Sequence, residues 1–397
     1  MQPLIPLDEA RARLLDQLKV SAAVESVALD DANDRILAQD LVAHMNVPPK
    51  ANSEMDGYAL CEQDAIEGRV LTVSQRIPAG AVTQPHIAGS VARIFTGAEL
   101  PDGADLVVMQ ENTERLDSGE VRILQTARAG ENVRQAGLDI KQGEVVLKRG
   151  TRLTPAALGV CASIGIERVD LYKPLRVALL STGDELVEPG TALRAGQIYN
   201  SNRPMLLNLL RQAGFEPVDL GQVADNPEAT LAALERAQAE ADAILTMGGV
   251  SVGEEDHVKN AIQALGSLDL WRIKIRPGKP FAAGEVKGTP VFGLPGNPMS
   301  ALVTFAMLAR PCLMRIQGAT YKPALRIPVS VGFDRNSQMR DEFVRVELHD
   351  GVAMRMASQS SGVLSSALNA DGLLHLPADL EIKKGQQFDF IPFCNLL

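Results

Sequence analysis

The residues with the clearest capacity for chemistry stand in the stretch 243–259, AILTMGGVSVGEEDHVK. Its apolar start, Ala243 to Leu245, is typical of a buried strand, and a helical pattern begins near Val258. Backbone N–H groups in a glycine-rich turn between a strand and a helix can surround an anion, and acids just beyond can hold a metal ion beside it. The residues of this turn are Gly248, Gly249, Ser251, Gly253, Glu254, Glu255 and Asp256. The structural alternative is a tight turn with an acid-capped helix.

Three other apolar runs of the same region end in loops of similar chemistry. STGDEL follows LRVALL, GQVADNP follows the run near Val218, and LPGNPMS follows VFG. They contribute Ser181, Thr182, Gly183, Asp184, Glu185, Asp225, Gly296, Asn297 and Ser300. Asp225 and Asn297 could instead be helix caps. Because the carboxyl ends of parallel strands meet at one edge, these loops predict a single ligand crevice.

A basic run, WRIKIRPGKP at 271–280, supplies charge of the opposite sign. Arg272, Lys274 and Arg276 alternate, so on one strand they would share a face. Lys279 follows in a Gly-Pro-rich loop, and the alternative is a solvated edge strand. An anion loop, carboxylates and a basic strand together favour phosphoryl or phosphoanhydride chemistry with Mg²⁺. The sequence lacks both GxxxxGK[ST] and a GxGxxG after a strand, which argues against a P-loop NTPase and a dinucleotide dehydrogenase.

Composition narrows the class of protein. The net charge of −10 over 397 residues argues against nucleic acid and anionic membranes as partners, so an anionic ligand must meet a local basic cluster. The four cysteines and five histidines are scattered and predict neither a zinc site nor a disulfide framework. The chain starts without a signal-peptide pattern, and its apolar runs are too short to span a bilayer. These features favour a reduced, cytoplasmic protein.

The elements that must position these residues divide the chain into an α/β multidomain fold. Helical spacing occupies 7–18 and 154–165, and short β-rich runs fill the interval between Pro48-Pro49 and about residue 142. We therefore expect a segmented domain I (1–50 and 143–173) with a β-rich domain II (51–142) inserted in it. Alternating strands and helices predict a doubly wound, mainly parallel domain III at 174–322. Short strands return at 323–397 and predict a small β-barrel or sandwich, domain IV.

The motifs, taken as an ordered set, resemble the molybdopterin molybdenumtransferase (MoeA) family, which includes the E domain of gephyrin. The set is MDGYA (55–59), FTGAELPDGAD (95–105), NVRQAGLDI (132–140), STGDEL, GGVSVGEEDHVK, RPGKP (276–280) and GLPGNPMSA (293–301). The resemblance covers essentially the whole chain. It implies four domains, with a MogA-like molybdopterin-binding domain III and a C-terminal β-barrel, in an elongated homodimer whose cleft takes residues from both subunits.

The implied reaction converts adenylylated molybdopterin and molybdate into molybdenum cofactor, AMP and water, with Mg²⁺. The resemblance implies catalytic roles for Asp56, Thr96, Asp139, Glu185, Asp225 and Asp256, with Asp184, Glu185, Asp225 and Asp256 as metal ligands. It implies substrate contacts at Ser181, Thr182, Gly248, Gly249, Ser251, Gly253, Arg272, Lys274, Arg276, Lys279, Pro295, Asn297, Ser300, Arg345 and Ser361. Arg276 replaces the first lysine of the family's KPGK, which keeps the charge and changes its geometry.

Other interpretations stay open at this point. The candidate residues outside domain III also have purely structural interpretations. Asp56 could be a turn residue, Thr96 could belong to a turn at a strand end, Asp139 could serve the turn before Gly143, and Arg345 could be an exposed charge. The expected partners are adenylylated molybdopterin, molybdate, a second copy of the chain, the molybdopterin adenylyltransferase and downstream cofactor-handling proteins. The functional alternatives are a non-catalytic molybdopterin-binding scaffold and a paralogue that handles tungstate.

Overall fold

The apolar runs of domain III form the central sheet of the protein. A computed structural model describes residues 3–248 and 257–396. Its largest α/β unit has a six-stranded sheet in the order β17-β14-β18-β22-β21-β19. The first four strands are parallel, and β21 runs antiparallel to its neighbours β22 and β19, which confirms the mainly parallel sheet. The strands are β14 (Arg176–Thr182), β17 (Glu216–Val223), β18 (Ala243–Met247), β19 (Gly266–Arg272), β21 (Pro280–Val286) and β22 (Thr289–Leu294).

Helices cover both faces of this sheet because its buried strands send apolar side chains to each side. Val177 and Leu179 of β14 join one core, whereas Ala178 and Leu180 join another, as the two-residue repeat of a strand requires. Helices α4 (Pro227–Glu240) and α5 (His257–Leu265) pack on the second core. The first core holds α1 (Leu7–Gln17), α3 (Asn202–Gln212) and the run α6 (Pro298–Thr304), η4 (Phe305–Ala309) and α7 (Arg310–Gln317).

The run from α6 to α7 is long and apolar enough to cross a membrane by length and composition. Of its most apolar 18-residue window, 83% is buried inside the protein, where Phe305, Leu308 and Leu313 are fully enclosed. Helix α1 also packs there, against α7, although its chain segment continues directly into domain I.

Domain I is built from two distant segments, as expected. Strand β13 (Arg168–Tyr172) pairs antiparallel with β1 (Val24–Ala28) and with β2 (Ile36–Leu37), and β12 (Val145–Leu147) pairs with β3 (Leu41–Val42). Helix α2 (Pro155–Ser163) covers them and begins at Thr154, whose hydroxyl accepts a hydrogen bond from the Ala157 N–H. The short strands β4 (Asn52–Ser53) and β11 (Val133–Arg134) lead into and out of the inserted domain.

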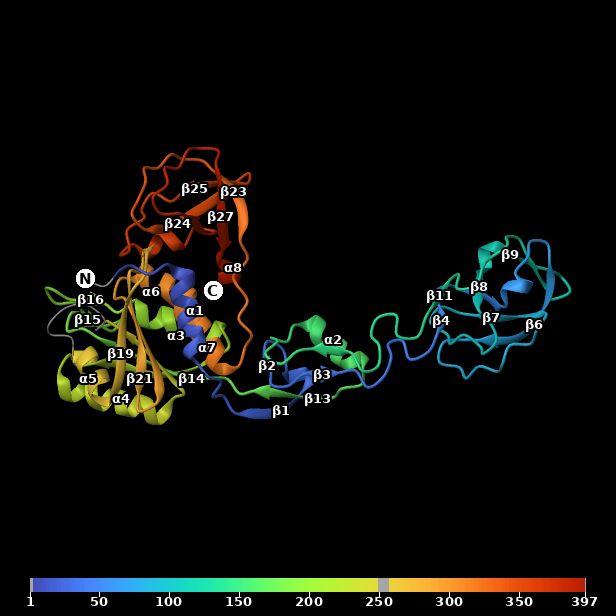
Figure 1. The fold of residues 1–397 in the computed structure, drawn as a ribbon, viewed down its shortest axis with the longest axis horizontal. Coiled ribbons are helices and arrows are strands. Elements are labelled where there is room, and N and C mark those ends of the chain that lie inside the picture. Colours follow the sequence, from blue (N-terminus) through green and yellow to red (C-terminus); the bar gives the residue numbers. More distant parts are fainter. Residues whose placement is uncertain (1–2, 249–256, 397) are drawn as a thin grey trace.

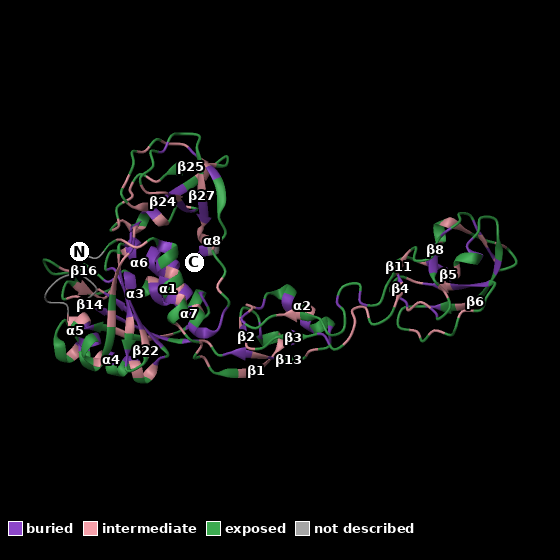
Figure 2. Cartoon of the chain, viewed as in Figure 1, coloured by how far each residue is buried: buried purple, intermediate pink, exposed green. Residues whose placement is uncertain are grey.

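Domain II is the expected β-rich unit. Its sheet has the order β8-β5-β7-β6-β10-β9. The strands are β5 (Gly57–Leu60), β6 (Val70–Ile77), β7 (Ser90–Ile94), β8 (Leu106–Met109), β9 (Thr113–Arg115) and β10 (Val121–Ile123). In Figure 1 domains I and II form an arm that extends from the body, with domain II at its far end. Figure 2 shows that buried residues concentrate in the body and that much of the arm is exposed.

Domain IV is a barrel rather than a sandwich. The strands are β23 (Ile327–Val331), β24 (Asp341–His349), β25 (Val352–Arg355), β26 (Gly372–Leu376) and β27 (Gln387–Pro392). They follow the order β24-β25-β23-β27-β26, and the pairing of β24 with β26 closes the sheet on itself. The chain then ends in α8 (Phe393–Leu396), beside β27 and β26.

The basic run at 271–280 differs from the single strand that its alternation predicted. Arg272 ends β19 in the α/β sheet, whereas Arg276 lies in β20 (Ile275–Arg276), which pairs with β24 of the barrel. Lys274 stands between them, where its N–H donates to the Ile5 carbonyl (2.7 Å) and its carbonyl accepts from the Asp341 N–H (3.0 Å). The prediction that the three cations lie on a single strand was wrong because the chain changes sheets at this point, which residue alternation does not reveal.

Candidate functional site

The carboxyl ends of four parallel strands form one edge of the α/β sheet. Ser181, near the end of β14, is fully buried; its hydroxyl accepts from Asn200 Nδ2 (2.9 Å) and donates to the Gly221 carbonyl (3.3 Å). On the next strand, Gly248 has φ +86°, and a Cβ there would lie 3.1 Å from the Thr182 carbonyl oxygen. The ends of β14 and β18 therefore approach each other closely, which the missing side chain of Gly248 allows. This edge brings together Ser181, Thr182 and Gly248, as expected.

Exposed carboxylates follow two neighbouring strands of this edge, β14 and β17. Asp184 and Glu185 come after β14, and Asp225 comes after β17, which pairs with β14 in parallel. The Glu185 carboxylate folds back over Gly183, where an added Cβ would lie 2.7 Å from Oε2. Asp225 is not a helix cap, because α4 is capped by Asn226, whose Oδ1 accepts from the Ala229 N–H at 2.9 Å. Its side chain therefore stays available to a ligand.

Part of the expected site lies outside the described residues: Gly249, Ser251, Gly253 and Asp256, together with Glu254 and Glu255. Within residues 3–248 and 257–396, there is no group of three or more His, Cys, Asp or Glu side chains placed to hold a metal. The carboxylates at 184, 185 and 225 thus do not form a closed cage by themselves.

The loop after β22 presents polar groups beside the same edge. Pro295 is buried, and the Gly296 carbonyl accepts from Asn202 Nδ2 at 2.7 Å. Asn297 stands at the first position before α6, yet its exposed side chain makes no capping hydrogen bond, so the alternative of a simple cap does not hold. Ser300 is buried in the first turn of α6. Asn202 Oδ1 is also buried and has no hydrogen-bond partner among the described atoms, which marks this loop as open to a further donor.

The RPGKP loop lies against one side of α6, near Ser300 and Thr304. Gly278 has φ +102°, and a Cβ there would lie 2.6 Å from Thr304 Cγ2, so only glycine fits between the loop and the helix. This contact leaves Lys279 exposed, and the described part of the chain offers its ammonium no hydrogen bond or ion pair. Arg276 pairs with Glu342 of the barrel (3.2 Å), and Lys274 pairs with Asp379 (3.2 Å).

Arg345 is not the exposed strand charge that its sequence context allowed. It is fully buried in β24, and its Nη2 donates to the carbonyls of Ser358 (2.9 Å) and Ser360 (3.1 Å). Burial lowers the pKa of its guanidinium, and the nearby charge of Arg355 adds to this effect. The loop that it holds reaches α6, because the Ser361 carbonyl accepts from the Met299 N–H at 3.0 Å. Arg345 and Ser361 thus come together with Ser300 and Lys279 where the barrel meets domain III.

A separate group lies in domain II. Asp56 Oδ1 accepts from both the N–H and the hydroxyl of Thr96, each at 2.8 Å, which joins the MDGYA and FTGA motifs. These two hydrogen bonds, with the charge of Arg93, lower the pKa of the Asp56 carboxyl. Asp139 is exposed in the loop that leads back to domain I, and its N–H donates to the Val47 carbonyl (2.9 Å). Figure 1 places β7, which ends just before Thr96, in the unit at the far end of the arm from β14.

Three polar residues at the start of α3 were not anticipated: Asn200, Asn202 and Arg203. Arg203 donates through Nε and Nη2 to Asp219 (2.9 and 2.6 Å) and through Nη1 to Glu188 (2.5 Å). It thereby ties the segment after β14 to strand β17. The only signal in the sequence was the polar run YNSNRP before an apolar helical pattern, which does not distinguish site support from a helix start.

Successive parts of the chain match three protein-family descriptions. "MoeA N-terminal region (domain I and II)" matches residues 5–165, "Probable molybdopterin binding domain" matches 178–315, and "MoeA C-terminal region (domain IV)" matches 331–393. A Haemophilus influenzae protein named molybdopterin molybdenumtransferase is 42% identical over 316 residues, 79% of this chain and 78% of its own length. The Mycobacterium tuberculosis protein named molybdopterin molybdenumtransferase 2 is 36% identical over 380 residues, covering 91% and 93% of the two chains.

Solved structures agree over nearly the whole chain. The crystal structure of the molybdopterin biosynthesis MoeA protein from Pyrococcus horikoshii aligns with a TM-score of 0.84 at 29% identity, covering 98% of this chain and 100% of that one. A second Pyrococcus MoeA structure aligns with a TM-score of 0.79 at 32% identity and covers 98% and 99% of the two chains.

Proposed function

The chain belongs to the MoeA family of molybdopterin molybdenumtransferases, and from that premise we propose how its own residues perform the reaction. It is a transferase of molybdenum cofactor biosynthesis that inserts molybdate into adenylylated molybdopterin. The observation that carries the assignment of the site is the edge where β14, β17, β18 and β22 end. There the turn at Gly248, the buried hydroxyls of Ser181 and Thr182, and several exposed carboxylates lie beside the β22–α6 loop.

The pyrophosphate of the substrate lies against this edge, near Ser181, Thr182 and Gly248. Asp184, Glu185 and Asp225 provide the hard oxygen ligands that Mg²⁺ uses. Mg²⁺ commonly takes only one or two carboxylates and completes its shell with substrate phosphates and water, which fits a described site without a closed cage. The bound ion supplies positive charge to the phosphoanhydride oxygens. Asn297 and the unpartnered Oδ1 of Asn202 orient the nucleotide part of the substrate.

Molybdate is a tetrahedral dianion and requires fixed positive charge and hydrogen-bond donors. The junction of domains III and IV supplies both in this chain. Lys279 is an exposed cation of the RPGKP loop without an ion pair among the described residues, and Arg272, Lys274 and Arg276 stand close to it in sequence. Ser300 and Ser361 lie on the two sides of the Met299–Ser361 hydrogen bond. Arg345, with none of its surface exposed, supports this junction through the loop that it holds.

The catalytic cleft is shared between two copies of the chain. Asp56 and Thr96 lie in domain II, at the opposite end of the molecule from the strand-end edge, so one chain does not bring the two groups together. Homodimers with two-fold symmetry are the commonest assemblies. In such a dimer domain II of each copy would meet domain III of the other, which gives two equivalent clefts. We place the protein in the cytoplasm, where the adenylyltransferase and downstream cofactor-handling proteins are its expected partners.

The test of catalysis is AMP release from adenylylated molybdopterin with molybdate, and with Mg²⁺ added or chelated. We expect release only with Mg²⁺, and Asp225→Asn should lower the rate about 100-fold or more because a metal-holding or proton-handling carboxylate is lost. Asp269→Asn, at an exposed acid of β19, is the matched control and should leave the rate unchanged. Tight substrate binding without AMP release would support the scaffold alternative, which the relatives' names do not favour.

Molybdate recognition is tested by the molybdate concentration that gives half-maximal AMP release. Lys279→Ala should raise it at least about tenfold, because a charged hydrogen bond to the dianion is lost, with little effect on substrate binding. Lys384→Ala, an exposed lysine of domain IV, is the control. An unchanged molybdate response would remove Lys279 from the site, and repeating the titration with tungstate tests the other alternative.

The shared cleft is tested by mixing two inactive variants. Asp56→Asn and Asp225→Asn chains, refolded together, should form mixed dimers in which one cleft has both native carboxylates. Random pairing in a symmetric dimer then restores about a quarter of the wild-type rate. No recovery, with mixed dimers demonstrated by affinity tags, would show that both carboxylates act in the cleft of a single chain and would overturn the shared cleft.

A further inference from the structure

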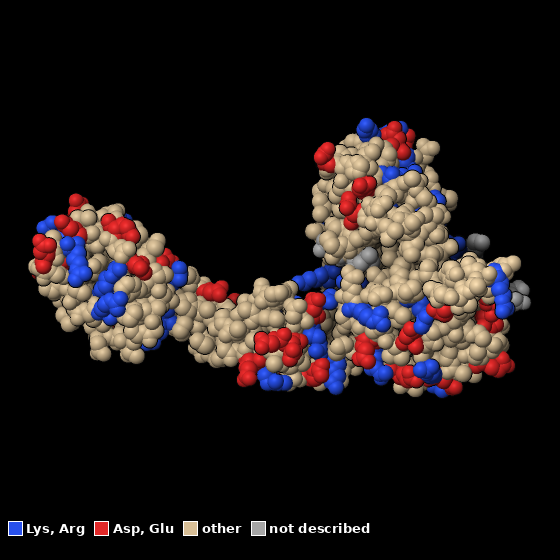
Figure 3. Space-filling model, turned by 180° about the vertical axis from the view of Figure 1, so that it is seen from behind, with Lys and Arg blue, Asp and Glu red and all other residues tan. Residues whose placement is uncertain are grey.

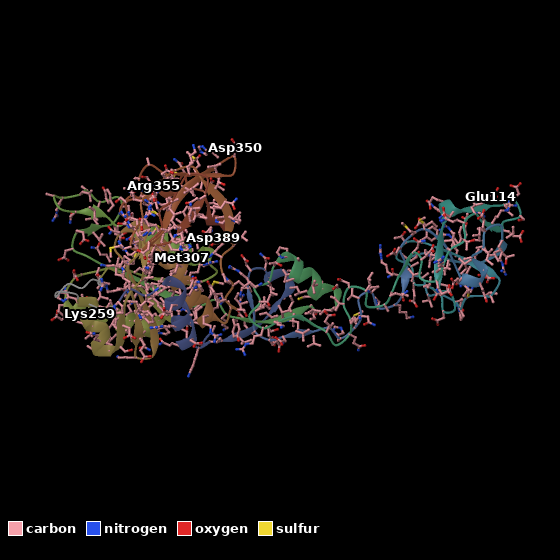
Figure 4. The ribbon with its side chains drawn as sticks, turned by 45° about the horizontal axis from the view of Figure 1, so that its top comes forward. Glu114, Lys259, Met307, Asp350, Arg355 and Asp389 are labelled. Atoms are coloured by element: carbon pink, nitrogen blue, oxygen red, sulfur yellow. The ribbon has the colours of Figure 1, made fainter. Side chains whose placement is uncertain are left out.

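A basic pocket lies where the arm meets the body, away from the strand-end edge. This joint pocket is a cavity of about 830 Å³ between residues 146–154 of domain I, the η4–α7 run of domain III, and the linker 319–326 that leads to the barrel. Figure 3 shows Lys and Arg side chains gathered at the junction of arm and body. Figure 4 places Met307, which lines the pocket, and Asp389 where the barrel meets the α/β domain. The catalytic proposal uses none of the lining residues.

Domain I contributes three cations to one wall. Arg149 donates through Nε to the Tyr172 hydroxyl (2.7 Å), which fixes its direction, and Arg152 pairs with Asp34 (3.1 Å). Lys148 is exposed, and within the described residues its ammonium has no hydrogen bond or ion pair. Two guanidinium groups are therefore held in place beside one uncommitted ammonium.

The body contributes the opposite wall. Arg310, at the start of α7, donates through Nη1 only to the Leu396 carbonyl (3.3 Å), and its Nε is buried without a hydrogen-bond partner among the described residues. Burial lowers the pKa of this guanidinium, and the nearby charge of Arg152 adds to the effect. Arg11 of α1 stacks on Tyr321 at 5.2 Å, and Lys322 and Arg326 come from the linker.

Only part of the charge of this lining is balanced by acids. No Asp or Glu lines the pocket itself, but Arg152 pairs with Asp34, Arg11 with Asp8, and Arg326 with Asp8 and Asp389 at 3.9 and 3.3 Å. Within the described residues, no acid pairs with the remaining cations, which are Lys148, Arg149, Arg310 and Lys322. In a chain of net charge −10, gathering cations from three domains around one cavity is unfavourable unless an anion lies between them. The apolar side chains of Met307, Met314 and Leu325 line the rest of the cavity and can cover an uncharged part of a ligand.

We propose that the joint pocket binds a small phosphorylated molecule, whose phosphate groups lie between the domain I cations and Arg310. Guanidinium groups in fixed orientations match phosphate oxygens, and the unpartnered Nε of Arg310 gains an acceptor. Since the walls belong to the arm and to the body, a bound ligand bridges them and restrains the arm. The restrained arm carries Asp56 and Thr96, so binding in the joint pocket regulates the position of domain II relative to the body.

The test uses inorganic tripolyphosphate as the probe and the full-length protein at low salt. The pocket variant is Lys148→Gln/Lys322→Gln, since both lysines are exposed and folding does not depend on them. The control variant, Lys383→Gln/Lys384→Gln, removes the same charge from an exposed site on domain IV. Titration calorimetry should show that the pocket variant weakens one binding event about tenfold, whereas the control retains it.

Amide exchange locates that event. The Thr320 N–H donates to the Gly150 carbonyl at 2.9 Å and so joins the linker to domain I beside the pocket, whereas the Met299 N–H reports on the catalytic junction. Tripolyphosphate should slow exchange at Thr320 in the wild type and the control but not in the pocket variant. Identical isotherms in all three proteins, or protection at Met299 alone, would overturn the proposal by confining anion binding to the catalytic crevice.

Discussion

Replacing Arg345 with Met separates two roles that the same residue could have. If Arg345 contacts molybdate, the change raises the molybdate requirement and leaves the barrel intact. In the structure it has no exposed surface, and its Nη2 bridges two carbonyls of the 358–361 loop, so we expect the change to act on that loop first.

The expected magnitude follows from the groups left behind. Arg345→Met removes the charged donor from the Ser358 and Ser360 carbonyls, and a hydrogen bond to a charged group contributes about 1.5–3 kcal/mol. Removing a buried charge offsets part of this loss, because that charge is expensive to keep out of water. Gln359 still binds the backbone of Arg345 in both directions, at 3.0 and 2.8 Å, so the loop is weakened rather than released. We therefore expect a local destabilisation of about 2–4 kcal/mol.

Global unfolding of a multidomain chain is not two-state, so the assay should be local. Hydrogen exchange at the Met299 N–H, which donates to Ser361, reports the contact between this loop and α6. It should accelerate in Arg345→Met, with a lower rate of AMP release. The exposed Arg355 provides the control, since Arg355→Met should change stability by no more than about 0.5 kcal/mol. Unchanged exchange at Met299 together with a raised molybdate requirement would refute this reasoning.

Three further outcomes are expected. The pKa of the Asp56 carboxyl should lie below the usual value of about 3.9. The stability that this carboxylate adds is therefore present above that pH and is lost as the pH falls through its lowered pKa. An NMR titration should show that Thr96→Val brings the pKa of Asp56 closer to its usual value. Arg203→Gln should cost about 1–2 kcal/mol in urea unfolding of domain III, because two carboxylates lose their shared partner; no change would show that solvent screens both pairs. Gly278→Ala should destabilise by about 2–3 kcal/mol, seen as a lower melting temperature, because its φ is positive and Thr304 blocks the new methyl group.

Much of the fold could be predicted because it depends on local periodicity. The strand at 243–247 and the helices at 7–17 and 155–163 follow directly from apolar spacing, and the inserted domain follows from helical segments on both sides of a β-rich interval. Periodicity could not show that α1 packs with α7 in the α/β core, because that contact joins segments that are far apart in the sequence, Leu7–Gln17 and Arg310–Gln317. It also could not show that the chain changes sheets between Arg272 and Arg276, since both strands have the same alternation.

The candidate site was predictable only in part, for a related reason. Residue types and loop positions identified Ser181 and Asp225 at the strand ends, where topology alone brings them together. The environment of a side chain was not predictable in the same way. Arg345 was expected to be a substrate contact or an exposed charge, but it is buried and its guanidinium donates to backbone carbonyls. Asp56 makes its two hydrogen bonds to Thr96, in a motif 40 residues away. Such contacts depend on distant packing, which motif matching does not encode.

Charge provides the connection between the two sites proposed for this molecule. Some cations of this acidic chain are neutralised by a nearby acid, as Arg276 is by Glu342 and Lys274 by Asp379. Lys279 and Lys148 have no such partner within the described residues, and each belongs to a segment fixed by packing, through Gly278 and through the β12–β3 pairing. A cation that is held in place without a partner is prepared for an anion that the chain does not itself provide. We therefore expect salt to weaken both sites, but only binding in the joint pocket to bridge arm and body.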